Sequence, residues 1–256
     1  MTYTSPVLVS SEGHVSTLIM CSLPHNYIDL NLITALADAL EELDSDDCCR
    51  ALVLGSSGKS FCAGADFSVT SGFDPLNDTS KLYEQGMRLL QTRKPIVAAV
   101  NGPAIGAGAG LALLADFRIV GPASRFSVPF NRLGLHPGFG MTHTLPRLVG
   151  LQVAARLFYT CERLNGEQML KLGLADEIVP DGEVVLRAQA LALEIAKSAP
   201  LAVQSTRVTL RLGLVDEIRT ANAREWQIQQ SQFSSQDFLE GITAASEHRP
   251  PVFKGR

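Results

Sequence analysis

The sequence of 256 residues predicts an α/β fold in which a largely parallel sheet is followed by a helical C-terminal region. Short unbroken apolar runs, typical of strands buried on both faces, alternate with stretches of helical periodicity in the first part of the chain. After Gly150 only helical patterns follow, separated by Pro180 and Pro200. Strands that alternate with helices imply right-handed crossovers, and therefore parallel strands.

The N-terminal part begins with two short strands, expected over residues 7–9 and 15–20, around a turn at 11–13. Asp29 can then cap a helix, because a carboxylate at this position accepts hydrogen bonds from free backbone N–H groups. The apolar positions of this helix fall at helical spacing and are Leu32, Ile33, Leu36, Leu40 and Leu43.

Three further apolar runs, 51–54, 96–100 and 117–120, are expected to be buried strands. A helix is expected over 82–91. The segment before it, 68–80, is rich in Ser, Gly, Asp and Pro, which favours a loop. Such a loop either covers a ligand pocket or is a plain surface loop.

The C-terminal third carries a series of expected helices, at 152–159, 166–172, 183–198, 201–212, 217–231 and 237–247. We interpret residues 1–195 as an α/β core and 196–256 as a C-terminal helical region.

Composition excludes several classes of protein. The chain is 46% hydrophobic and 19% charged, as in a globular protein with a large core. Its net charge of −4, without a basic block, argues against a nucleic-acid partner. The N-terminus lacks the pattern of a signal peptide, and no apolar run is long enough to cross a membrane. We therefore expect a cytoplasmic protein without membrane insertion.

The five cysteines are odd in number and lack CxxC spacing; they are Cys21, Cys48, Cys49, Cys62 and Cys161. This pattern fits a reducing compartment and argues against a zinc site or a disulfide framework.

Two stretches, 52–66 and 94–116, share one pattern: a buried strand, a glycine-containing turn and then small residues. A glycine-rich turn that leads into a helix directs unpaired backbone N–H groups at one point, which suits a bound phosphate or an oxyanion formed during a reaction. The same small residues can also serve close packing of a helix on a sheet. No nucleotide fingerprint fits, because Leu111 stands where a third glycine would be needed.

The motifs FCAGAD at 61–66 and VNGPAIGAG at 100–108 resemble the signatures of the enoyl-CoA hydratase/isomerase (crotonase) superfamily. The resemblance covers nearly the whole chain. It implies a crotonase-like (ClpP/crotonase) fold, a spiral of ββα turns, that binds an acyl-CoA thioester. It also implies that the C-terminal helices pack over neighbouring subunits in a homotrimer or in a hexamer of two trimers. CoA would be part of the substrate, and no separate cofactor is implied.

Carried over by motif, the thioester oxygen would lie between the backbone N–H groups of Ala63 and Ala107. The other residues that the resemblance places along the substrate are Asn26, Tyr27, Ile28, Lys59, Ala65, Asp66, Phe67, Gly106, Gly110, Phe130, Leu133, His248 and Phe253. Lys59 would meet a phosphate, and His248 and Phe253 the CoA of a neighbouring subunit. For Lys59 and His248 an ordinary solvated surface position is equally open.

The sequence departs from the family at the acid–base positions. The two glutamates of a hydratase correspond to Gly110 and Phe130, and a third carboxylate position, used by some relatives, corresponds to Gly138. General acid–base groups contribute roughly 10²–10⁴ in rate each. Water addition by the usual two-glutamate mechanism is therefore not expected.

Other side chains could supply a base. His136 is the first candidate, because a neutral imidazole acts as a base near pH 7; the alternative is that it fixes the turn before Pro137. Asp74, Asp78 and Glu84 either approach the ligand from the loop or are solvated.

Two readings of function follow. The first is an enzyme, an enoyl-CoA hydratase-like lyase or isomerase that lacks the usual glutamates. The second is a non-catalytic acyl-CoA-binding protein, or a hydrolase or decarboxylase variant of the same fold. The complete FCAGAD motif favours CoA binding under both readings. Product analysis with a panel of acyl-CoAs would separate them.

Overall fold

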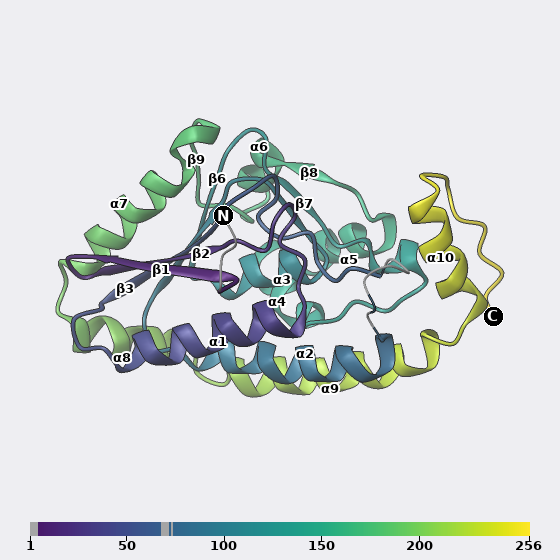
Figure 1. Cartoon of the computed structure of the whole chain (residues 1–256), viewed down its shortest axis with the longest axis horizontal. Coiled ribbons are helices and arrows are strands. Elements are labelled where there is room, and N and C mark those ends of the chain that lie inside the picture. Colours follow the sequence, from purple (N-terminus) through teal and green to yellow (C-terminus); the bar gives the residue numbers. More distant parts are fainter. Residues whose placement is uncertain (1–4, 68–71, 73) are drawn as a thin grey trace.

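A computed structural model describes residues 5–67, 72 and 74–256 of the chain. Its centre is a six-stranded sheet in the order β1-β2-β3-β4-β6-β9 (Figure 1). The strands are β1 (Val7–Glu12), β2 (Val15–Met20), β3 (Ala51–Ser56), β4 (Ile96–Val100), β6 (Phe117–Val120) and β9 (Glu177–Ile178). Only the β1–β2 pair of this sheet is antiparallel, and the other neighbouring pairs are parallel. The predicted α/β fold with a largely parallel sheet is confirmed.

A second, three-stranded sheet consists of β5 (Pro103–Ile105), β7 (Arg125–Ser127) and β8 (Leu164–Asn165). The sequence did not predict it, because strands of three residues or fewer are too short to show a pattern. Its strand β5 begins within the second glycine-containing turn, so it helps to position that turn.

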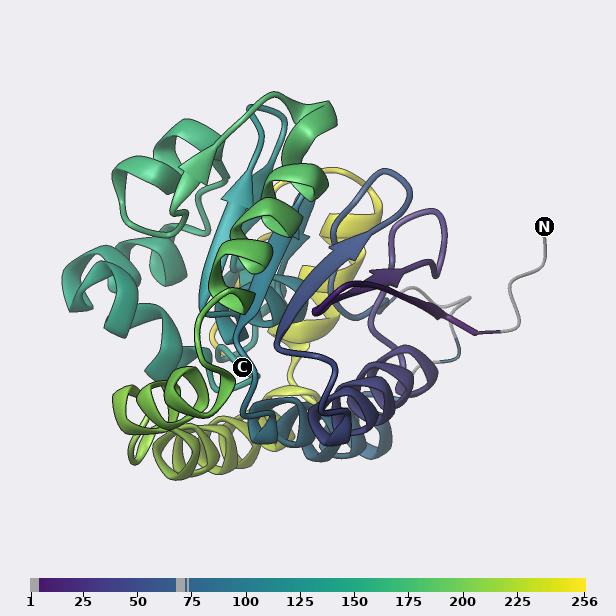
Figure 2. The same ribbon diagram turned by 90° about the vertical axis from the view of Figure 1, so that its left-hand side faces the viewer.

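The two faces of the main sheet bury alternate residues of each strand, as the two-residue repeat of a strand requires. Val53 and Val97 pack with Ala188 and Ala192 of α7 (Val184–Ala196) on one face. The alternate residues of these strands point to the opposite face of the sheet and belong to the main core. Helices α1 (Leu30–Ser45) and α3 (Ala107–Leu114) cover that face (Figure 2).

Helix α1 begins where the sequence predicted. The side chain of Asp29 accepts a hydrogen bond from Leu32 N at 2.7 Å, and all five apolar positions of the expected stripe are buried. The helix ends near Lys94, whose buried ammonium group donates to the carbonyl oxygens of Leu43 and Asp46. A cation at the C-terminal end of a helix is favourable.

The loop predicted over 68–80 is partly wrong. Helix α2 (Pro75–Arg88) already begins inside it, because Asp74 caps the helix and Pro75 suits its first turn. The 3₁₀ turn η2 (Leu89–Gln91) completes the expected helix. Residues 68–71 and 73 lie outside the described part of the chain.

The predicted C-terminal helices are confirmed with small shifts at their ends. They are α5 (Leu151–Thr160), α6 (Gly166–Lys171), α7, α8 (Pro200–Leu210), α9 (Leu214–Gln232) and α10 (Gln236–Ser246). Helix α4 (Met141–Val149) and the 3₁₀ turns η3 (Pro129–Leu133) and η4 (Asp181–Glu183) were not predicted. Helix α9 packs against α2 and α4, and α10 packs against η3. The division of the chain at residue 195 stays a prediction. None of the described helices combines the length and apolar character needed to cross a membrane.

Candidate active site

The two glycine-containing loops of the sequence, after β3 and after β4, run side by side. Cys62 pairs with Ala104 in an isolated parallel bridge. Cys62 N donates to Pro103 O, and Ile105 N donates to Cys62 O, each at 3.0 Å. Two stretches about forty residues apart therefore meet through their backbones. Burial raises the pKa of the Cys62 thiol to about 12, so this side chain stays neutral and is a poor nucleophile.

Small residues are required where the loops meet. A Cβ atom on Gly108 would lie 2.1 Å from Cys62 O, and one on Gly64 would lie 2.7 Å from Ile105 O. Gly64 also has a φ of +83°, which favours glycine. The packing interpretation of these glycines is therefore correct, and the same contact brings the N–H groups of both loops together.

In the first loop, the backbone N–H group without a described acceptor belongs to a different residue from the one predicted. Ala63 N donates to His25 O at 3.1 Å, so it is already satisfied. Ala65 N, two residues on, has no acceptor within the described part of the chain. The prediction for Ala63 is thus corrected: its backbone is held by His25, and Ala65 carries the available donor.

In the second loop, Ala107 is the first residue of α3, and the N-cap residue Gly106 makes no side-chain cap. The first N–H groups of a helix have no partner inside it and lie at the positive end of its dipole. A Cβ atom on Gly64 would lie 3.6 Å from Ala107 N, so the first loop passes close to this donor. The role predicted for Ala107 N at a thioester oxygen stays a prediction.

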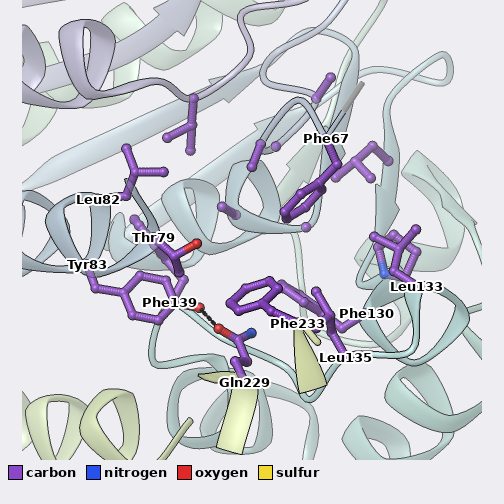
Figure 3. A pocket seen from close by; sticks show the side chains of 18 residues that line it. Phe67, Thr79, Leu82, Tyr83, Phe130, Leu133, Leu135, Phe139, Gln229 and Phe233 are labelled. Carbon is purple, nitrogen blue, oxygen red and sulfur yellow. Dashed lines mark hydrogen bonds between the residues drawn. The ribbon is translucent and has the colours of Figure 1, made fainter. Parts of the chain in front are cut away.

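A cavity of about 680 Å³, which includes its open mouth, lies against both loops (Figure 3). Its walls are Ile28, Ala63, Gly64, Ala65, Phe67, Thr79, Leu82, Tyr83, Ile105, Gly106, Ala107, Pro129, Phe130, Leu133, Leu135, Phe139, Gln229 and Phe233. Most of these side chains are apolar, and the polar ones are Thr79, Tyr83 and Gln229. Among the described residues, no Asp, Glu, Lys, Arg or His lines this cavity.

Aromatic groups take up the three positions at which the resemblance implied carboxylates in the family. Phe130 itself lines the cavity. The ring of Phe139 lies against Gly110, whose Cβ would be 2.6 Å from Phe139 Cδ1. The hydroxyl of Tyr83 covers Gly138, whose Cβ would be 1.7 Å from Tyr83 Oη. The packing of Phe139 and Tyr83 therefore leaves no room for an acidic side chain at positions 110 and 138.

A buried carboxylate behind the cavity holds this arrangement. Glu225 of α9 accepts hydrogen bonds from Gly140 N at 2.7 Å, Thr142 N at 2.9 Å and Thr142 Oγ1 at 2.6 Å. These groups begin α4, so the charge lies at a helix N-terminus. Burial raises the pKa of Glu225, while the hydrogen bonds from Thr142 and Gly140 oppose that rise. Phe139, with φ +63°, immediately precedes Gly140. We call the hydrogen bonds from Gly140 and Thr142 to Glu225 the Glu225 clamp.

Tyr83 remains protonated at neutral pH, because burial raises its pKa and the nearby charge of Glu225 raises it further. Its hydroxyl donates to Gln229 Oε1 at 2.7 Å, and Gln229 Nε2 donates to His136 O at 2.7 Å. Tyr83 can therefore donate a hydrogen bond but does not act as a base.

Eight of the predicted site residues line the cavity: Ile28, Ala63, Ala65, Phe67, Gly106, Ala107, Phe130 and Leu133. Four predicted CoA contacts are exposed on the surface of this chain: Tyr27, Lys59, His248 and Phe253. Asn26 is fully buried, and its amide donates to the carbonyl oxygens of Ser57 and Ser60, so it fixes the first loop instead of contacting ligand. Asp66 follows Ala65 in the sequence, is half-buried and is not among the described lining residues. Gly110 lies beneath Phe139.

The proposed bases are not brought to the cavity. His136 Nδ1 lies 2.7 Å from Pro137 O, and a carbonyl only accepts, so this nitrogen carries the proton. His136 is absent from the described lining, which favours its alternative role at the turn before Pro137. Asp74 caps α2, Asp78 pairs with Lys81 at 3.8 Å, and Glu84 is exposed.

The sequence missed the walls that α2 and α9 supply: Thr79, Leu82, Tyr83, Gln229 and Phe233, together with Leu135 and Phe139. Helical spacing of Thr79, Leu82 and Tyr83, and of Gln229 and Phe233, marked a common face of each helix. It did not show that the two faces meet, because they are about 150 residues apart. Across the described ranges, no group of three or more His, Cys, Asp or Glu side chains could hold a metal ion.

The docked loops and their apolar cavity place the chain in a known class. The chain belongs to the enoyl-CoA hydratase/isomerase family, whose family model matches residues 16–256. The resemblance found in the sequence is thereby confirmed.

Particular relatives match along the whole chain. Crotonyl-CoA hydratase of Syntrophomonas wolfei is 32% identical, with 99% of both chains covered. 2,3-Dehydroadipyl-CoA hydratase of Escherichia coli is 33% identical and covers 98% of this chain and 100% of its own. Among solved structures, an enoyl-CoA hydratase/isomerase from Pseudoalteromonas atlantica has a TM-score of 0.89 at 30% identity, with 98% of this chain and 100% of that chain covered.

The contact between the loops can be tested with a glycine that has no room. Gly108→Ala should unfold the site or lower the free energy of unfolding by several kcal/mol, because its Cβ overlaps a backbone oxygen that cannot move alone. Gly182→Ala is the matched control, because nothing lies within 4 Å of that position. Chemical denaturation measures both. Equal stability of the two variants would contradict the backbone contact.

Proposed function

We propose that the chain binds acyl-CoA thioesters and that the backbone N–H groups of Ala65 and Ala107 hold the thioester oxygen. The observation that carries the proposal is that two donors, one from each loop, adjoin an apolar cavity and have no acceptor among the described residues. Such donors stabilise negative charge that develops on the oxygen and need no reorganisation when it forms. The names of the relatives, which are hydratases of CoA thioesters, support the same ligand.

The reaction we propose is a lyase- or isomerase-type step on an enolate, without water addition by paired glutamates. Formation of the enolate moves charge onto the thioester oxygen, where the two N–H groups stabilise it, and the α-proton passes to water or to a group of the substrate, because no described lining residue can accept it. No carboxylate lines the described cavity to bind and activate water. Phe130 and Phe139 replace it with apolar rings. Among the described lining residues, Tyr83 is the titratable side chain. It stays protonated and can donate a hydrogen bond. The same lack of a base favours a second candidate, an acyl-CoA-binding protein without turnover.

Removal of one donor tests the oxyanion assignment. Proline at the first position of a helix is tolerated and lacks the N–H, so Ala107→Pro should keep α3 and lose the hydrogen bond. We expect about tenfold weaker binding of an acyl-CoA thioester and unchanged binding of its thioether analogue. Ala107→Ser keeps the N–H and is the control. Calorimetric titration measures both ligands; equal losses for thioester and thioether would contradict the assignment.

The hydration mechanism can be tested by rebuilding it. Gly110→Glu with Phe130→Glu restores both acids, but the first acid collides with Phe139. The triple variant that also carries Phe139→Gly should hydrate crotonyl-CoA at a rate roughly 10²–10⁴ times that of the double variant. Loss of absorbance of the enoyl thioester measures the rate, and circular dichroism checks folding. Wild-type turnover of roughly 10–10³ per second would show that this chain hydrates by other groups.

We also propose that the chain forms a homotrimer or a hexamer of two trimers. Exposed leucines of the helical part offer apolar surface that a neighbouring subunit would cover, and four of them are each at least 73% exposed: Leu151, Leu201, Leu210 and Leu212. Light scattering should give three or six times the mass of one chain. Leu201→Glu with Leu210→Glu should lower that mass. A stable monomer at micromolar concentration would refute the proposal.

A further inference from the structure

We infer that the site selects uncharged, bulky apolar acyl groups, aryl or of medium chain length, and rejects acyl groups that end in a carboxylate. The inference rests on the proposed function, namely that the cavity receives the acyl part of a CoA thioester. Three features of the wall carry it: the lack of cations among its described residues, its aromatic rings and the pairing of Tyr83 with Gln229.

The cavity offers a carboxylate no partner. None of its described lining residues carries a charge. The buried ionisable group behind the wall is Glu225, whose carboxylate binds α4 and would repel another anion when ionised. An unpaired carboxylate in such surroundings is costly.

The wall is a chain of aromatic rings in contact. Tyr83 meets Phe139 at a centroid distance of 6.2 Å and Trp226 at 6.3 Å, both edge to face. Trp226 continues to Phe233 at 6.3 Å, and Phe233 to Phe67 at 6.5 Å. Figure 3 shows Phe67, Phe130, Phe139 and Phe233 around the cavity. Such rings bind flat or branched apolar groups over a large area.

Two of the three polar side chains of the wall, Tyr83 and Gln229, bind each other. Tyr83 donates to Gln229, which donates onward to the carbonyl oxygen of His136. A polar acyl group that bound either side chain would have to break this pair, whereas an apolar group leaves it intact. Both side chains are therefore satisfied without a polar ligand.

The test compares hexanoyl-CoA with adipyl-CoA, which have the same number of acyl carbons and differ by the terminal carboxylate. The protein has one tryptophan, Trp226, and its ring packs against Tyr83 and Phe233 of the wall, so its fluorescence is a probe of occupancy; calorimetry gives the same affinities independently. We expect adipyl-CoA to bind at least about 100-fold more weakly. From butyryl- to octanoyl-CoA, binding should strengthen about three- to fourfold per methylene.

Variants connect this preference with the wall. Phe233→Ala should weaken hexanoyl-CoA at least about tenfold, while Phe117→Ala, at an exposed ring on β6, should not. Leu133→Lys places a cation at the half-buried edge and should lower the hexanoyl-to-adipyl ratio at least about tenfold.

The outcomes separate this inference from the function on which it rests. Equal affinity for hexanoyl- and adipyl-CoA would overturn the selectivity and leave acyl-CoA binding in place. Binding of free CoA as tightly as every acyl-CoA would overturn the cavity as the acyl site. Absence of binding by any CoA compound would overturn the proposed function itself.

Discussion

The backbone contact between the loops after β3 and β4 is the constraint on which the site depends. Cys62 lies against Gly108 so closely that no side chain fits between them, and the bridge to Ala104 fixes the register of the two loops. Because parallel strands end at the same edge of a sheet, both loops leave β3 and β4 together. Within the described part of the chain, Ala65 N and Ala107 N are left without acceptors, one in each of the two loops. The positions of these two donors are therefore a property of the main chain.

The cavity beside the loops does not arise from the loop contact alone, because helices that are distant in sequence enclose it. Helix α9 supplies Gln229 and Phe233 to the wall and, through Glu225, the clamp that begins α4. That clamp follows Phe139, whose ring occupies the space above Gly110. The absence of an acid at position 110 and the aromatic wall thus have one cause in the packing of Phe139. A substitution at position 110 alone cannot reverse it, because the space for the new side chain is already filled.

Much of the fold could be predicted, since strands such as β4 and helices such as α1 carry strong periodic patterns and a good cap. The three-residue strand β5 was missed because it is too short for any pattern. At the site, the motif indicated both loops but not which N–H group of the first is free. The bond from Ala63 to His25 depends on a loop some forty residues earlier, which no local pattern reveals. Phe139 and Tyr83 were missed for a similar reason, because their roles follow from where α2 and α9 pack.

The most direct measurement is the infrared spectrum of a bound acyl-CoA that carries ¹³C at its thioester carbonyl. Two N–H donors on one oxygen polarise the C=O bond and lower its stretching frequency. The wild-type protein should therefore shift the carbonyl band below its position in water, and Ala107→Pro should shift it less. A bound thioester whose band stays at the position of the free ligand would contradict the convergence of Ala65 N and Ala107 N on the substrate.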